Sequence, residues 1–236
     1  MHCWSVVCAN STQVGLCVFG HVNNILSNPA GGACVGESMS ETTHRCLYQN
    51  VQSPQLKEWF CEVLHQYPEL ADRTVYLRKL NMRRSTMRAQ PVLNGRFWRR
   101  AKREYRVDFS SHLDITEHVK VQQLPRDVVV GWFAHELGHI VDYLHRPWVG
   151  MVSFGLGYAL WSRYMRKAER RADQIAVNHG FGAEVLATKN YLMTHSTLPP
   201  HYKERLRKYY LSADELEGLI TAWEEEREMP LVVEID

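Results

Sequence analysis

The stretch WFAHELGHIVDY, Trp132 to Tyr143, decides both the expected fold and the expected chemistry of this chain. It places two histidines four residues apart, with a glutamate directly after the first and a glycine directly before the second. The surrounding apolar run, Val128–His145, is stopped by Pro147 and predicts one long helix. Because positions i and i+4 share a helix face, His135 and His139 can offer imidazole nitrogens to a single ion.

Zinc is the ion that this pattern favours, because catalytic zinc accepts imidazole ligands and keeps one position open for water. Glu136 lies about 100° around the helix from His135, near the metal but not on it. A base must sit there to take a proton from a water that the metal activates. Gly138 has no side chain, so another backbone can approach the helix closely beside the site. Trp132 and Tyr143, which flank the histidines, are expected in the core. The alternative is that two histidines share one face by chance, as happens in roughly one such sequence in twenty.

A zinc ion held by two histidines needs a third protein ligand, and a second expected helix, Arg166–His179, supplies a candidate. Glu169 and Asp173 lie four residues apart on it and therefore share one face. Glu169 can complete a His-His-Glu set, and Asp173 can accept the other ring N–H of a ligand histidine and fix its tautomer. The alternative is that both acids pair with the arginines near them, namely Arg163, Arg166, Arg170 and Arg171.

The two motifs together, HELGH at 135–139 and E-x-x-A-D at 169–173, resemble the gluzincin metallopeptidases. The resemblance is to the heat-shock membrane protease and prenyl-protein protease group and to its compact soluble relatives, the minigluzincins. It covers roughly Ser53 to Leu211. The first motif is typical of zincins in general, and the second selects this branch.

The resemblance implies one Zn²⁺ per chain, bound by His135, His139 and Glu169. It assigns the activation of water to Glu136, and it places Asp173 behind the ligands, where it orients them.

The resemblance also implies that a peptide substrate lies extended along an edge strand, by strand addition to the sheet. The residues Arg83–Val92 or Tyr105–Phe109 would supply that edge, and the sequence does not choose between them. The family often has a His-Pro pair further along the chain, whereas here the text THSTLPPHYKERL, Thr194–Leu206, has no histidine before proline. The group that stabilises the oxyanion is therefore open among four polar residues, each of which has a surface or packing role as its alternative: His195, His201, Tyr202 and Arg205.

The whole pattern predicts an α+β fold, a small zincin-like metalloprotease domain. A short twisted sheet is expected to pack on the helix that carries His135, with a helical C-terminal half that brings Glu169. The alternating segments 74–80 and 105–109 predict two strands, and 83–92, ended by the turn signal Asn94-Gly95, is the candidate for a third. Further helices are expected to start at Ser53-Pro54, to run over 183–193, and to follow a capping box of Ser212 and Glu215 up to about Glu228.

Residues 1–50 differ in character from residues 51–236. They are rich in Gly, Ser, Asn and Thr, carry three charged residues and hold five of the six cysteines. They predict a poorly ordered extension, followed by one metallopeptidase domain. The metallopeptidase domain would hold one cysteine at most, which fits a reducing compartment better than a disulfide scaffold. With no convincing secretory signal, the sequence favours a cytoplasmic location.

The most apolar stretch is Trp148–Trp161, within an uncharged window of 16 residues. As a helix this window is roughly 24 Å long, too short to span a hydrocarbon core of about 30 Å. A buried hairpin or core helix is the favoured interpretation, and an element that dips into a membrane is the alternative, giving a possible peripheral membrane contact through 148–161. The basic, aromatic run Phe97–Arg100 lies in no recognisable nucleic-acid-binding fold, so no nucleic-acid partner is expected.

The expected function is that of a zinc-dependent metalloendopeptidase acting on a peptide or protein substrate. Glu136 would take a proton from water and pass it to the leaving amine, without a covalent intermediate. The alternative is a catalytically silent zinc-binding protein of the same fold, acting as a binding or regulatory module.

Overall fold

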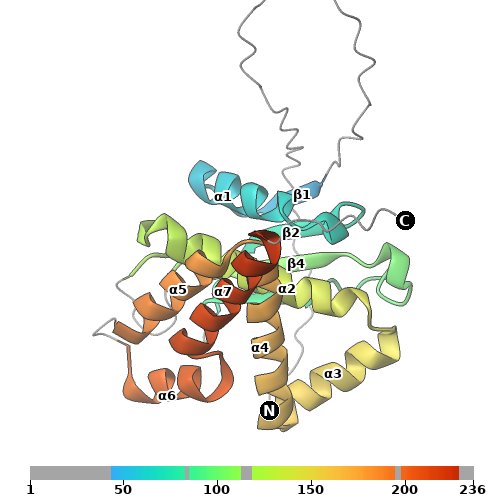
Figure 1. Cartoon of the computed structure of the whole chain (residues 1–236). Helices are drawn as coiled ribbons and strands as arrows, with labels where there is room; N and C mark the ends of the chain where they lie inside the picture. Colours follow the sequence, from blue (N-terminus) through green and yellow to red (C-terminus); the bar gives the residue numbers. More distant parts are fainter. Residues whose placement is uncertain (1–43, 83–84, 113–118, 195–197, 229–236) are drawn as a thin grey trace, which may run out of the picture.

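A computed structural model describes residues 44–82, 85–112, 119–194 and 198–228 of the chain (Figure 1). Within these ranges the fold is α+β, with one four-stranded sheet and a helical C-terminal half. The helices are α1 (Pro54–His65), α2 (Arg126–Leu144), α3 (Trp148–Leu160), α4 (Ser162–Asn178), α5 (Gly182–Thr194), α6 (Pro200–Tyr209) and α7 (Ala213–Glu228).

The sheet has the order β1-β2-β4-β3, with β1 (Arg45–Gln49), β2 (Thr74–Lys79), β3 (Met87–Pro91) and β4 (Tyr105–Phe109). The first three strands in this order are parallel, and β3 pairs antiparallel with β4. Residues alternate between the two faces of a strand, so Val75, Leu77 and Val107 enter the core from one face. The sequence left open whether residues 83–92 or 105–109 form the edge strand. β4 lies inside the sheet and β3 lies at its edge, so the edge strand is β3, within 83–92.

α1 begins as the sequence predicts. The side chain of Ser53 accepts a hydrogen bond from the backbone N–H of Leu56, and Pro54 occupies the first turn. The ring of Phe60 then packs edge-on against Phe133 of α2, with 5.1 Å between ring centroids. This contact fixes α1 against the helix that carries the HELGH motif.

α2 is the central element of the molecule. It contacts α1 and β3, and also α4 and α5. All of its residues from Val128 to Tyr143 are buried as a result, including Trp132 and Tyr143, which confirms that these two belong to the core. The histidines and glutamate of the motif therefore lie inside the protein rather than on a solvated helix face.

The boundary predicted at residue 50 is wrong in one respect. Residues 44–50 belong to the fold, because β1 pairs with β2 and buries Cys46 and Tyr48. β1 has only five residues and follows a Gly- and Ser-rich segment, so its sequence pattern does not distinguish it from that segment. Residues 1–43, which make up the rest of the predicted extension, lie outside the described residues.

Two helices also differ from the expected pattern. α6 has no counterpart among the helices expected from the sequence; Pro200 starts it at a position where its missing N–H costs no hydrogen bond. α4 starts at Ser162, four residues before the predicted Arg166. At the other end, the capping box before α7 is confirmed by reciprocal hydrogen bonds between Ser212 and Glu215.

The apolar stretch 148–161 forms neither a hairpin nor a core helix. It is the single helix α3, and only Met151, Phe154 and Gly157 of it are buried. The favoured interpretation was wrong because apolar composition alone does not tell whether a second layer covers the element. Among the described residues no helix is both long enough and apolar enough to cross a membrane.

Candidate metal centre

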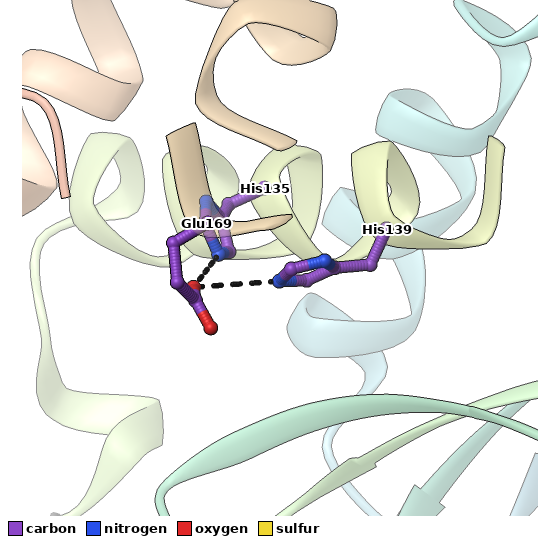
Figure 2. Close-up of side chains that lie close together, drawn as sticks. All are labelled: His135, His139 and Glu169. Carbon is purple, nitrogen blue, oxygen red and sulfur yellow. Dashed lines mark hydrogen bonds and ion pairs between the residues drawn. The ribbon is translucent and has the colours of Figure 1, made fainter. Parts of the chain in front are cut away.

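Three side chains from two helices meet beside α2 (Figure 2). His135 and His139 project from α2, and Glu169 comes from α4. The Oε2 atom of Glu169 lies 3.1 Å from Nε2 of His135 and 3.4 Å from Nε2 of His139. All three residues are buried, and they offer ligand atoms that lie within 4.8 Å of one another.

These separations can be compared with the geometry that zinc requires. Ligand bonds of about 2.0–2.1 Å in a tetrahedral arrangement put neighbouring ligand atoms about 3.3 Å apart. Both measured separations, 3.1 and 3.4 Å, are close to this edge length. Both separations between Glu169 and the histidines therefore match a tetrahedral zinc site, and the ligand atoms of the two histidines lie within 4.8 Å of each other, so the donor set can hold a metal ion.

The close approach of α2 and α4 depends on small residues at their crossing. A Cβ atom added to Gly138 would lie 2.6 Å from the carbonyl oxygen of Ala172, which is closer than real contacts allow. Ala168 and Ala176 are buried one turn to either side of Ala172. The sequence interpretation that Gly138 admits a neighbouring backbone is confirmed, and the neighbour is the helix that carries Glu169.

Asp173 lies behind the cluster and holds His135 in place. Its Oδ1 atom is 2.8 Å from Nδ1 of His135, so this nitrogen donates the hydrogen bond and leaves Nε2 free for the metal. Its Oδ2 atom accepts from Lys189 at 3.0 Å and from the backbone N–H of Leu211 at 3.2 Å. The carboxylate thus ties α4 to α5 and to the segment before α7. His139 has no such support, since its buried Nδ1 lacks a hydrogen-bond partner among the described residues.

The electrostatics of the cluster favour a cation. Burial by itself would lower the pKa of His135, but Asp173 and Glu169 outweigh burial and raise this pKa from 6.5 to about 10. The pKa of Glu169 falls well below its usual range, because His139 and His135 more than offset the effect of its burial. Two buried carboxylates thus hold a positive charge at this point, which a divalent cation satisfies better than a proton.

Glu136 is buried between the histidines and the edge strand. The backbone N–H of Ala89, in the middle of β3, donates a hydrogen bond to its carboxylate. Burial raises the pKa of Glu136, and the neighbouring His139 and His135 limit the rise. A carboxyl group with a raised pKa is suited to take up and return a proton near neutral pH.

Two tyrosines that the sequence did not single out also reach the site. The hydroxyl of Tyr158 on α3 donates a hydrogen bond to Oε1 of Glu169. The ring of Tyr210, at the end of α6, lies 5.6 Å from the ring of His135. Burial and the nearby charge of Glu169 raise the pKa of both hydroxyls, so both keep their protons at neutral pH. No spacing in the sequence relates them to HELGH, because only the folding of α3 and α6 brings them there.

The four predicted oxyanion candidates have different outcomes. His201 and Arg205 are exposed on α6, in positions typical of solvated side chains. Tyr202 is half-buried, packs against the core and is near enough to Tyr210 to affect its pKa. His195 lies outside the described residues.

The alternative pairing of the acids with arginines does not occur among the described residues. Arg170 pairs with Glu215 of α7, and Arg171 pairs with Asp142 of α2. Glu169 and Asp173 face the histidines instead.

Comparison with protein-family models, with curated proteins and with solved structures gives no match for this chain.

Proposed function

We infer that this protein is a zinc-dependent metalloendopeptidase, as its resemblance to the gluzincins implies. One observation carries the proposal. Glu169 of α4 lies within hydrogen-bonding distance of His135 and close to His139, while the remaining acid of the motif, Glu136, is buried between this cluster and an edge strand. A site for structural zinc needs four protein ligands and no free acid beside them.

The metal would be held by Nε2 of His135, Nε2 of His139 and Oε2 of Glu169. A zinc ion bound there would supply Lewis-acid chemistry, polarising the scissile carbonyl and making a water molecule more acidic. The hydrogen bond from Nδ1 of His135 to Asp173 fixes the tautomer that this binding requires.

The protein groups around the metal have separate roles in the proposed hydrolysis. Glu136 accepts a proton from the attacking water and returns it to the leaving amine. The hydroxyl of Tyr158 already donates its proton to Glu169 and so holds this ligand in place. Tyr210 keeps its hydroxyl proton and is the donor for the negative charge that develops on the carbonyl oxygen. β3 has an edge that does not pair with another described strand, and an extended peptide can add to it next to Glu136.

The test is proteolysis of an unfolded protein substrate by zinc-loaded wild type and by Glu136→Gln. Loss of a general base lowers rates by about 10²–10⁴-fold, and we expect a loss in this range with zinc content unchanged. Glu217→Gln, which removes the same charge from an exposed position on α7, should behave as wild type. Zinc-loaded wild type without activity would instead support the silent zinc-binding module.

A further inference from the structure

The exposed large hydrophobic residues of this protein are not scattered. Among the described residues there are nine of them, and all lie in two segments, Leu93–Trp98 and Trp148–Tyr164. Scattered single residues of this kind need no explanation, but a concentration of them marks a binding surface. Three of the nine are tryptophans, at positions 98, 148 and 161.

α3 contributes most of this surface with one of its faces. Trp148, Val152, Leu156 and Leu160 follow one another at intervals of four residues and are each about half or more exposed, from 45% to 68%. The opposite face packs inward through Phe154, whose ring lies 5.4 Å from that of Tyr143 on α2. α3 therefore has an apolar face on both sides, and no layer of the described residues covers the outer one. Figure 1 shows α3 at the margin of the molecule, beyond α4 and away from α5 to α7.

The segment after β3 extends the same surface. The ring of Trp98 meets that of Trp148 edge-on at 5.2 Å. Between this segment and α3 lies a groove of about 620 Å³, lined by Pro91, Leu93, Asn94, Phe97, Trp98, Met151, Val152, Gly155, Leu156 and Ala159. Pro91 is the last residue of β3, and Ala89 of the same strand contacts Glu136, so the surface begins beside the candidate metal centre.

The exposed charges that flank this surface are predominantly positive, and the acid next to them, Glu104, is buried and paired with Arg96. Residues 93–102 carry four Lys/Arg and residues 145–167 carry another four, so together they carry eight, with no Asp or Glu in either range. Seven of the eight are exposed: Arg96, Arg99, Arg100, Lys102, Arg163, Arg166 and Lys167. A basic rim around an apolar centre is complementary to an apolar surface that carries negative charge.

We propose that this surface docks the protein on an anionic lipid bilayer, with α3 and Trp98 lying in the headgroup region. α3 has 13 residues and is too short to cross a bilayer, so the proposed contact is peripheral. Tryptophan is the residue that best suits the boundary between headgroups and acyl chains. Exposed Arg and Lys add attraction to anionic lipids, and the exposed Val and Leu side chains supply apolar area that enters the bilayer. The inference does not depend on the proposed peptidase activity.

A second copy of the chain is the rival occupant, and the charges argue against it. Pairing this surface with itself would bring the two basic rims together, and no acid within either segment would compensate them. A lipid headgroup layer supplies that negative charge over the whole area of contact.

Co-sedimentation of the full chain with vesicles tests the proposal, using phosphatidylcholine alone and phosphatidylcholine with phosphatidylserine. We expect binding to the anionic vesicles and roughly tenfold or greater weakening in Val152→Glu/Leu156→Glu, because both side chains would carry charge into the interface. Both positions are exposed, so the variant should fold as wild type. Gln174→Glu/Ala222→Glu adds the same two charges at exposed positions on α4 and α7 and should bind as wild type.

Three outcomes would overturn the proposal. The first is no binding of wild type to anionic vesicles. The second is equal weakening by the two double variants, which would leave only net charge as the cause. The third is a wild-type dimer in sedimentation velocity that Val152→Glu/Leu156→Glu converts to a monomer, since a second copy would then cover the surface.

Discussion

His135 lies between two carboxylates, and this position determines how its ring behaves with and without a metal. In the metal-free protein the ring is protonated below a pKa of about 10, whereas the unfolded chain loses that proton near 6.5. A raised pKa means that this proton stabilises the folded metal-free state below about pH 6.5 and that the contribution disappears as the pH rises to about 10. Metal binding needs the neutral imidazole, so zinc must displace the proton.

The first prediction concerns that proton. At pH 8 zinc binding should release about one proton more from wild type than from Asp173→Asn, because the variant lacks the carboxylate that contributes most to the raised pKa of His135. Calorimetric titration in buffers of different ionisation enthalpy measures the number released. Subtracting the variant removes any proton that comes from metal-activated water in both proteins. Equal release by two folded proteins would show that His135 is not held protonated by Asp173.

Not every side chain at the site can be found from the sequence. The spacings within HELGH and within residues 169–173 are local, so they indicate which groups share a helix face, and the structure brings these groups together. Lys189, Tyr158 and Tyr210 come from three other parts of the chain. Their positions depend on how whole helices pack, which no local pattern encodes.

At the scale of elements, the site is held by the crossing of α2 and α4. Gly138 and Ala172 let the two backbones come close enough for Glu169 to reach both histidines. Long, strongly patterned helices such as α2 were predictable because periodicity and prolines mark them. The pairing of the short strand β1 and the exposure of α3 were not predictable, because both depend on which other elements pack against them.

The second prediction tests that crossing. In Gly138→Ala the new Cβ would lie 2.6 Å from the backbone of Ala172, so the helices must separate. We expect a loss of about 1–3 kcal/mol in unfolding free energy, measured by denaturant titration, together with weaker zinc binding. Gly218→Ala on α7 has nothing within 4 Å and should be neutral or gain up to about 1 kcal/mol. A Gly138→Ala protein as stable as Gly218→Ala would contradict the packing described.

At the scale of the whole molecule, the sheet and the helical half meet on α2. The sheet contributes Ala89 beside Glu136 and closes on its far side with β1. The apolar surface on α3 starts next to the same edge strand. The proposed substrate edge at β3 and the proposed lipid-binding surface on α3 would therefore be neighbours on the fold.

The third prediction tests whether β1 belongs to this unit. A chain that starts at residue 44 keeps β1, whereas a chain that starts at residue 51 loses it, together with the buried side chains of Cys46 and Tyr48. We expect the shorter chain to be less stable by about 4 kcal/mol, from lost apolar burial and an exposed edge of β2. Thermal unfolding of the two chains measures the difference. Equal stability would mean that residues 44–50 are dispensable, as the sequence alone suggested.

The most direct test of the metal centre is zinc content by elemental analysis, on wild type and Glu169→Ala purified side by side with equal zinc supplied. The site predicts near one zinc per chain in wild type and little in the variant, because removal of Glu169 leaves only two of the three ligands. Undiminished zinc in a folded Glu169→Ala protein would contradict the site, and with it the proposed hydrolase.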